Sequence, residues 1–261
     1  MDRLPLFNVD DYLALISALR SRGFEVRQAV DLASPPDRTD PALFIRHDVD
    51  LFLTDVDRFA AAEAEQGFRS TYYILLTGTY NPRTQANARV IRSLADLGHD
   101  VGLHYDLTIY PPGIDAARRR LSQELAILED LSGAPVRTLS MHQPHLGTED
   151  LFLDEPGLVN PSNPRWHKDL LYVSDSCRAW RDETLLTSFG AEPPRRLLLT
   201  THPELWLNGT ILDRHEYLMH ELVPRATMEA RVYLEQEVTA IWSTHKAPRA
   251  HDQREARRSA L

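Results

Sequence analysis

Two kinds of hydrophobic pattern alternate along the chain. Segments with apolar residues at helical spacing are separated by short apolar runs rich in β-branched and aromatic residues. The helical pattern predicts helices over residues 9–24, 54–67, 84–98, 114–133 and 226–245. The short runs predict strands over residues 24–30, 42–46, 70–76, 99–106, 136–142, 169–175 and 195–203. Regular alternation of strands and helices predicts a parallel sheet or a barrel within one domain.

Two further features of the pattern concern chain boundaries and connections. Thr54 is a candidate N-cap and Gly67 a candidate stop for the second helix. The stretch from Gln143 to Lys168 predicts a long irregular loop, which would either cover a site and select substrate or be a plain surface connection. We expect residues 1–245 to form the domain and residues 246–261 to form a polar, disordered tail.

The composition narrows the possible partners. A net charge of −9 argues against a nucleic-acid partner, which would favour a basic face. The single cysteine, Cys177, excludes a disulfide framework and a cysteine zinc cluster, so histidines and carboxylates would have to hold any metal. The N-terminus lacks a signal-peptide pattern, and no apolar run approaches the roughly 20 residues that span a bilayer. We therefore expect a cytoplasmic protein without a membrane span.

Ionisable residues gather where the predicted strands end. Five strand-like runs end in such a cluster: "FIRHDVD", "VGLHYD", "LSMHQPH", "LYVSD" and "LLTTHP". In barrels and open parallel sheets the carboxyl ends of the strands share one side, where ligands bind. The clusters therefore predict a single site built from several strands.

Structural explanations compete for some of these residues. Asp48 and Asp50 could cap the following helix. A calcium loop is excluded, because Phe52 and Leu53 stand where that loop needs an acid or amide and a glycine. The second "DVD", Asp55–Asp57, suits the first turn of a helix. Other histidines are expected to be structural: His47, His167, His215, His220, His245 and His251.

These clusters resemble the motifs of the polysaccharide deacetylase superfamily, which are metal-dependent carbohydrate esterases. "RHDVD" stands where the family has Thr-Phe-Asp-Asp-Gly, and "GHDVGLHYD" is similar to its "GHEIGNH" approach. "LLTTHP" resembles the late Leu-x-x-His motif, and "YVSDSCRAW", with Asp175 and Trp180, looks like its Asp-x-Trp region. The resemblance runs from about Ile45 to Trp206. It implies an α/β fold, a distorted (β/α) barrel of about seven parallel strands, and removal of acyl groups from sugars.

Strand positions and the resemblance together suggest roles for eight residues. Three are expected to hold a divalent metal, with zinc as the first expectation: Asp50, His104 and His142. The family pattern implies a base and an acid: Asp48 and His202. Asp175 is expected to orient a catalytic residue or to bind substrate. Arg46 and Trp206 are expected to hold an anion or a sugar ring of the substrate.

The sequence departs from the family pattern in two ways, of which the first is that its paired acids, Asp48 and Asp50, are not neighbours. The second histidine of the family's motif would fall four residues after His104, at Thr108. His142 is the predicted replacement, because it ends the next strand after the one bearing His104. Asp106 and His145 are the competitors. Either Asp48 or Asp50 could be the carboxylate ligand.

The predicted function is metal-dependent hydrolysis that removes an N-acyl (acetyl) group from a sugar or a sugar-containing precursor, so the expected partner is a small-molecule or glycan substrate. One alternative is an inactive barrel that binds carbohydrate or a partner protein, which the departure at Thr108 favours. The other is hydrolysis of a C–N bond outside sugars. The oligomeric state stays open.

Overall fold

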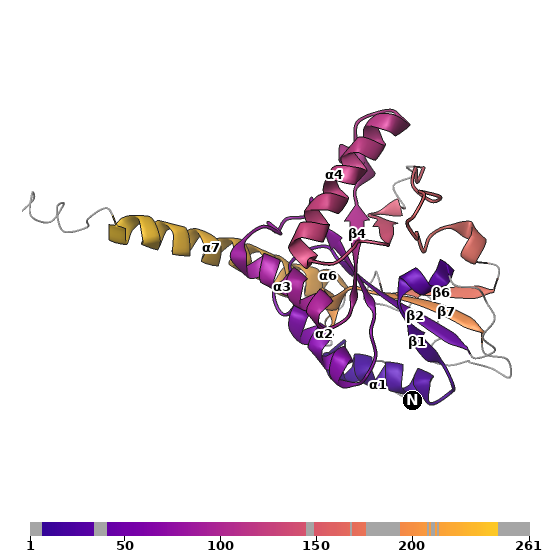
Figure 1. Ribbon diagram of the computed structural model, residues 1–261. Coiled ribbons are helices and arrows are strands. Elements are labelled where there is room, and N and C mark those ends of the chain that lie inside the picture. Colours follow the sequence, from indigo (N-terminus) through magenta and orange to yellow (C-terminus); the bar gives the residue numbers. More distant parts are fainter. Residues whose placement is uncertain are drawn as a thin grey trace, which may run out of the picture.

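Seven parallel strands form one curled sheet, a half-barrel, in the computed structural model of the protein (Figure 1). The structure describes residues 7–33, 41–144, 149–167, 169–175, 194–207, 209, 212 and 214–244. The strands are β1 (Glu25–Arg27), β2 (Ala42–Val49), β3 (Thr71–Leu75), β4 (Asp100–Tyr105), β5 (Leu139–Met141), β6 (Leu170–Ser174) and β7 (Arg196–Thr201). They run in the order β5-β4-β3-β2-β7-β6, and β1 pairs with the first residues of β2. The predicted α/β fold with about seven parallel strands is confirmed.

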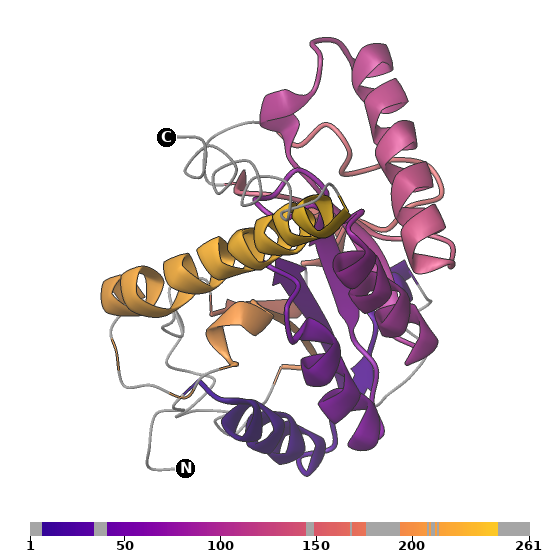
Figure 2. The same cartoon turned by 90° about the vertical axis from the view of Figure 1, so that its left-hand side faces the viewer.

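Helices cover the outer face of the sheet. The α-helices are α1 (Val9–Arg20), α2 (Val56–Glu65), α3 (Gln85–Asp96), α4 (Ile114–Ser132), α6 (Arg214–Tyr217) and α7 (Val223–Thr244). Shorter turns are η1 (Ala29–Ala33), η2 (Leu107–Ile109), η4 (Pro164–Trp166), η5 (Pro203–Leu205) and the π-turn η6 (Leu218–Leu222). In the view of Figure 2, α2 and α3 lie in front of the strands. Among the described residues, every helix is too short or too polar to cross a bilayer.

Two apolar cores lie on the two faces of β2. Ile45 and Val49 join the outer core beneath the helices, where they meet Phe59 of α2. Phe44 joins a smaller core inside the half-barrel with Leu198 of β7. This division follows from the pleat, because successive side chains of a strand point to opposite faces.

The loop after β5 packs against the edge of the sheet and against the inner core. Val159 forms a parallel bridge with Thr138 and accepts a hydrogen bond from the Leu139 backbone at 3.0 Å. Val159 and Trp166 pack against the inner core. Residues 149–167 therefore extend the sheet beyond β5, while residues 145–148 and 168 lie outside the described part.

The start of α2 differs from the sequence prediction. The N-cap of α2 is Asp55 and not Thr54, and Asp55 has a φ of 66° without a side-chain capping bond. Its carboxylate accepts instead from Arg225 at 3.0 Å and Arg58 at 3.3 Å. Gly67, with a φ of 76°, follows this helix as predicted. The predicted tail, residues 246–261, falls outside the described residues.

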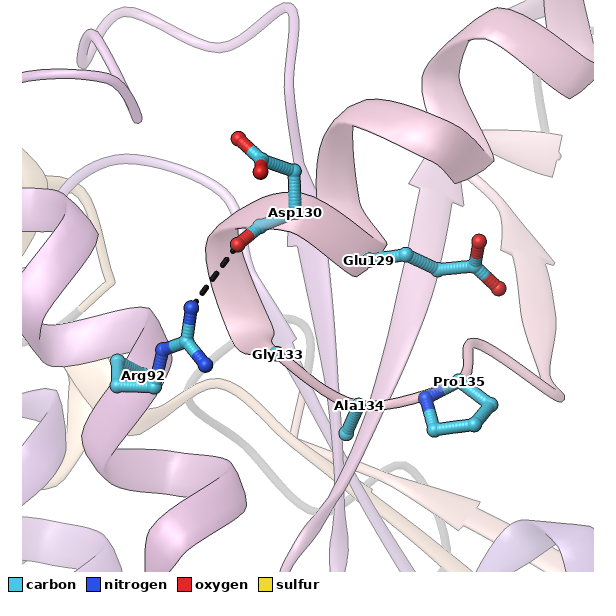
Figure 3. A pocket seen from close by; sticks show the side chains of 6 residues that line it. All are labelled: Arg92, Glu129, Asp130, Gly133, Ala134 and Pro135. Carbon is cyan, nitrogen blue, oxygen red and sulfur yellow. Dashed lines mark hydrogen bonds between the residues drawn. The ribbon is translucent and has the colours of Figure 1, made fainter.

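A surface pocket of about 450 Å³ lies where α4 ends, before the start of β5 (Figure 3). Gly133 caps α4 with a φ of 69°, and the Arg92 guanidinium of α3 lies where a side chain at Gly133 would stand. Arg92 donates to the Asp130 carbonyl at 3.0 Å. This contact joins α3 to α4 at the end of the sheet opposite the strand carboxyl ends.

A buried carboxylate joins the helices to the outer face of the sheet. Glu63 of α2 is fully buried and accepts hydrogen bonds from four donors. The hydroxyls of Tyr12, Tyr72 and Ser70 donate to it, the latter two at 2.7 and 2.6 Å. The fourth donor is Nε2 of His47, 2.9 Å away. Its charge is therefore matched inside the core, as buried carboxylates require.

His47 extends this network to β7. Its Nδ1 lies 2.6 Å from Oγ1 of Thr201, so one imidazole links Glu63 to the neighbouring strand. Thr201 directly precedes His202, and His47 directly precedes Asp48. The network thus holds β2 and β7 together just below the ends that carry predicted site residues.

We predict that Glu63→Gln lowers stability and weakens its dependence on acid pH. Burial opposes ionisation, but His47 lowers the pKa of Glu63 from 4.5 to about 2. A lowered folded-state pKa stabilises the protein above the unfolded value, and this stabilisation disappears as pH falls from about 4.5 to about 2. The shift corresponds to about 3 kcal/mol.

Urea unfolding at pH 7 and pH 3 measures this effect. Glu63→Gln should be less stable than the wild type at pH 7, and the gap should narrow at pH 3. Glu65→Gln, on the exposed side of the same helix, is the control and should behave as the wild type. An equal gap at both pH values would contradict the assignment.

Candidate metal centre

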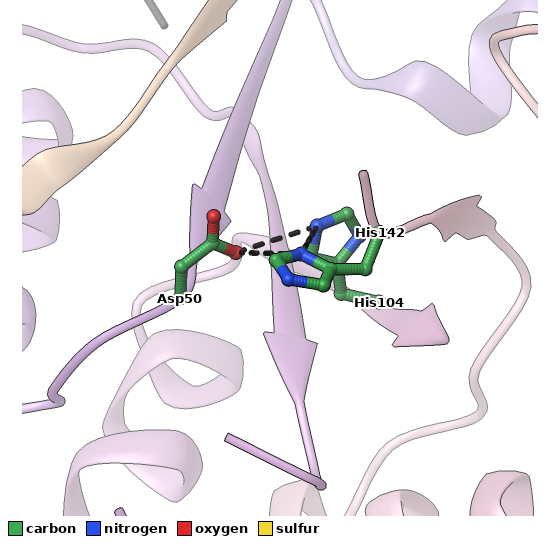
Figure 4. Close-up of side chains that lie close together, drawn as sticks. All are labelled: Asp50, His104 and His142. Atoms are coloured by element: carbon green, nitrogen blue, oxygen red, sulfur yellow. Dashed lines mark hydrogen bonds and ion pairs between the residues drawn. The ribbon is translucent and has the colours of Figure 1, made fainter. Parts of the chain in front are cut away.

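Asp50, His104 and His142 converge at the carboxyl ends of β2, β4 and β5 (Figure 4). Asp50 follows β2, His104 lies near the end of β4, and His142 follows β5. Nε2 of His104 lies 3.2 Å from Nδ1 of His142, and these nitrogens lie 3.4 and 3.5 Å from Oδ1 of Asp50. A tetrahedral ion with bonds of about 2.0–2.1 Å keeps its ligands about 3.3 Å apart. The three donor atoms therefore have the spacing of one face of a zinc tetrahedron.

The protonation of His104 also suits a metal ligand. Its Nδ1 lies 2.9 Å from the Ser140 carbonyl oxygen, which can only accept, so in the neutral ring Nδ1 carries the proton and the lone pair of Nε2 can bind a metal. A backbone carbonyl that accepts from the other ring nitrogen commonly orients metal-binding imidazoles. Oδ1 of Asp50 is buried and has no hydrogen-bond partner among the described residues. A divalent cation fits this donor set, because it would satisfy that oxygen and both lone pairs.

The charge of Asp50 shapes the titration of its neighbours. Burial opposes ionisation of Asp50, but the imidazoles of His104 and His142 hold its pKa well below the usual range. Burial disfavours the imidazolium form of His142, but Asp50 raises the pKa of that ring. A pocket that favours positive charge on an imidazole also favours a cation.

Asp48 lies beside the three converging groups and is held by an arginine of its own strand. Arg46, two residues earlier on the same face of β2, approaches Oδ1 with Nε at 3.0 Å and Oδ2 with Nη2 at 2.5 Å. The guanidinium lies 5.0 Å from the centre of the Tyr73 ring. Burial opposes ionisation, yet Arg46 keeps the pKa of Asp48 below its ordinary value. In the structure Arg46 pairs with Asp48, and its expected contact with an anion or a sugar stays a prediction.

His202 approaches the other oxygen of Asp50. Its Nε2 lies 3.8 Å from Oδ2 of Asp50, and its Nδ1 lies 2.7 Å from Oδ1 of Asp175. Burial lowers the pKa of His202, but Asp175 and Asp50 outweigh burial and raise it well above the ordinary value. The raised pKa favours the imidazolium form of His202, and the buried carboxylate of Asp175 holds the ring in one orientation.

Trp206 has a different position from the one predicted. The indole is fully buried and packs against Phe7 and Tyr12. Its Nε1 donates to Oδ2 of Asp175 at 2.6 Å. A fully buried ring has no free face for a sugar, so the expected substrate contact is corrected: Trp206 anchors Asp175.

One of the two competing ligands, Asp106, falls elsewhere. Asp106 caps η2, where its Oδ1 accepts from the backbone and the hydroxyl of Thr108 at 2.9 and 2.6 Å. His145 and Trp180 lie outside the described residues. Thr108, where the resemblance in the sequence would place a second histidine, is therefore hydrogen-bonded to Asp106.

One buried acid of the site escaped the sequence prediction. Oε1 of Glu204 accepts from the backbone N–H groups of Asp50 at 2.7 Å and Leu51 at 2.9 Å. The available signal was its place in "HPELW", two residues after His202. An acid so close to a strand-end histidine was a reasonable candidate.

Comparison with known proteins gives a fold-level likeness. No family model matches the chain, and no curated protein matches it. Among solved structures it resembles a CE4 family pseudoenzyme from Bacillus anthracis, with a TM-score of 0.44 and 13% identity over 75% of this chain and 63% of that one. It spans somewhat less than two thirds of that pseudoenzyme's chain.

Two further structures are similar at the same level. One is a family 4 acetyl xylan esterase from Clostridium thermocellum in complex with cobalt, with a TM-score of 0.40 and 12% identity over 72% of this chain and 84% of that one. The other is the chitin deacetylase of Colletotrichum lindemuthianum, with a TM-score of 0.43 and 15% identity over 71% and 79%. The function therefore has to be argued from the residues of this site.

We predict that the protein binds about one zinc ion per chain through Asp50, His104 and His142. Asp50→Asn, His104→Ala and His142→Ala should each lower the zinc content measured by elemental analysis after dialysis, because each removes a ligand. Asp106→Asn should keep its zinc, since that carboxylate caps η2.

His167→Ala is the matched control, because His167 is exposed. Wild-type zinc content in both histidine variants of the site would refute the assignment. Loss of zinc only in Asp106→Asn would make Asp106 the ligand.

Proposed function

We propose that the protein is a metal-dependent hydrolase that removes an N-acyl group, with acetyl as the first expectation, from a sugar or a sugar-containing precursor. One observation carries the proposal: His104 and His142 approach Oδ1 of Asp50, while His202 approaches Oδ2. A set of metal ligands thus lies directly beside a protonated imidazole and an arginine-bound carboxylate.

Zinc is the first expectation for the metal, and two imidazoles with one carboxylate also suit other divalent ions. When bound, such an ion polarises an acyl carbonyl and lowers the pKa of water from 15.7 towards about 7. Asp50, His104 and His142 would hold it. Asp48 is ionised and 3.9 Å from Nε2 of His104, a position from which it can take a proton from water.

His202 has the opposite task. Its raised pKa keeps a proton on the ring at neutral pH, and the Asp175 contact at Nδ1 leaves Nε2 facing the site. A leaving amine must gain a proton as the amide C–N bond breaks, and Nε2 is placed to give it. Asp175 and Trp206 keep the imidazole in this orientation, whereas Arg46 does the same for Asp48.

The substrate class follows from the family resemblance in the sequence. Sugar N-acetyl groups are the first expectation. A cytoplasmic location, which we expect from the sequence, would favour a nucleotide- or lipid-linked sugar over a finished polymer. Hydrolysis of a C–N bond outside sugars uses the same chemistry and is tested with the same assay.

The second candidate function is a barrel that binds carbohydrate without turning it over. Thr108 at the place of a family histidine favours it, and structures of similar fold are described both as a pseudoenzyme and as a deacetylase. A binding protein would need neither a base nor an acid. Retention of both Asp48 and His202 at the site supports the hydrolase.

We predict that Asp48→Asn and His202→Ala keep the metal but lose turnover. Each proton transfer typically contributes about 10²–10⁴-fold, so each variant should lose a comparable factor. The assay is acetate release from a panel of N-acetylated sugars, sugar nucleotides and simple amides by the zinc-loaded protein.

Asp96→Asn and His167→Ala, both at exposed positions, are the matched controls and should keep full turnover. Near wild-type rates in Asp48→Asn and His202→Ala would remove the two proton-transfer roles. Glycan binding without acetate release from any member of the panel would favour the binding protein.

A further inference from the structure

The backbone that carries Asp50 leaves the sheet just before that residue. β2 ends at Val49, so the N–H groups of Asp50 and Leu51 lie beyond the last strand residue. Oε1 of Glu204 accepts from both of them, at 2.7 and 2.9 Å. Without this acceptor, two N–H groups at the base of the proposed metal ligand would lose their side-chain partner.

The turn that carries Glu204 is itself held firmly. Glu204 lies in η5, with Pro203 at the first position of the turn and His202 at its N-cap. The hydroxyl of Tyr217, which is buried, donates to the Glu204 carbonyl at 2.8 Å. Directly after the turn, the indole N–H of Trp206 donates a hydrogen bond to Asp175. Glu204 is therefore a fixed acceptor and not a mobile surface acid.

The position of this carboxylate is unfavourable apart from the two hydrogen bonds. Glu204 is 1% exposed, and Oε2 is buried without a hydrogen-bond partner among the described residues. An apolar side chain would avoid this desolvation, so the acid is explained only by what its oxygen holds in place.

We propose that Glu204 is a positioning residue that fixes the Asp50–Leu51 backbone and so brings the Asp50 carboxylate to His104 and His142. The inference rests on the proposed metal site. The short turn η5 then contributes two residues to the site. His202, at its N-cap, faces Oδ2 of Asp50 as the proposed acid, and Glu204 holds the backbone of Asp50. The segment "HPELW" therefore carries both the proposed proton donor, His202, and the residue that positions the metal ligand Asp50.

Zinc affinity of the full-length protein tests this inference without any substrate. The apparent Kd is measured by competition with a chromogenic chelator, and the cobalt-loaded protein supplies a visible spectrum that reports ligand geometry. Glu204→Ala should weaken zinc binding roughly 10–100-fold, the usual effect of losing an outer-shell partner, and should change the cobalt spectrum. Glu204→Gln should restore most of both, because the amide oxygen can accept the same two bonds.

Two further variants keep the test decisive. Glu204→Asp retains the charge but withdraws the oxygen by one methylene, so it should weaken zinc binding even if Glu204→Ala fails to fold. Glu124→Ala is the control: Glu124 is also buried, but it contacts Tyr110 and Arg120 near α4. Its zinc affinity should equal that of the wild type, whatever its stability.

The outcomes separate the two levels of the proposal. Absence of zinc binding by the wild type would overturn the metal site itself. Wild-type affinity and spectrum in both Glu204→Asp and a folded Glu204→Ala would overturn only the positioning role. Failure of Glu204→Gln to restore binding would also overturn it, since the charge and not the acceptor would then be responsible.

Discussion

The hydrogen bond between His47 and Glu63 decides which side of β2 faces the site. Arg46 and Asp48 share the concave face of this strand, so His47 between them must point into the helix layer. Glu63 accepts its proton there, and Thr201 holds the second ring nitrogen. A shift of β2 by one residue would place the Arg46–Asp48 pair in the outer apolar core and leave Glu63 without its imidazole. Such a shift costs several kcal/mol for each unpaired charge, so the register of β2 is strongly specified.

The carboxylates around the site differ in the partners that hold them. Asp48 is bound by the Arg46 guanidinium, and Asp175 by the His202 imidazole and the Trp206 indole. Asp50 differs from both, because its Oδ1 meets only imidazole nitrogens, one of which must keep a lone pair. Asp48 and Asp175 thus each have a fixed partner, whereas Oδ1 of Asp50 faces two imidazole nitrogens without a hydrogen bond among the described residues. This distribution also explains why Asp50, and not the adjacent Asp48, is the carboxylate that suits a metal.

The sequence predicted those parts of the site that depend on local regularity. Parallel strands end on one side, so His104 and His142 could be placed together from the strand pattern alone. The partners of the site residues were harder to find, because they depend on contacts between distant segments. Glu204 reaches Asp50 across 154 residues of sequence. The burial of Trp206 depends on α1 covering it, and the cap at Asp55 depends on a positive φ that Thr54 gave no reason to expect.

The free-energy cost of burying two carboxylates, Asp175 and Glu204, helps to distinguish the two proposed functions. Asp175 and Glu204 are both buried carboxylates beside the proposed site, where Asp175 contacts His202 and Glu204 accepts from the Asp50 backbone. Apolar residues of similar size would often be neutral or more stabilising at such positions. A protein that only bound glycans could accept that exchange, since neither acid lies where a ligand could touch it. Asp175 fixes the orientation of His202, and Glu204 fixes the backbone that carries Asp50. Together they support a site that both holds a metal and delivers a proton, which is the requirement of amide hydrolysis.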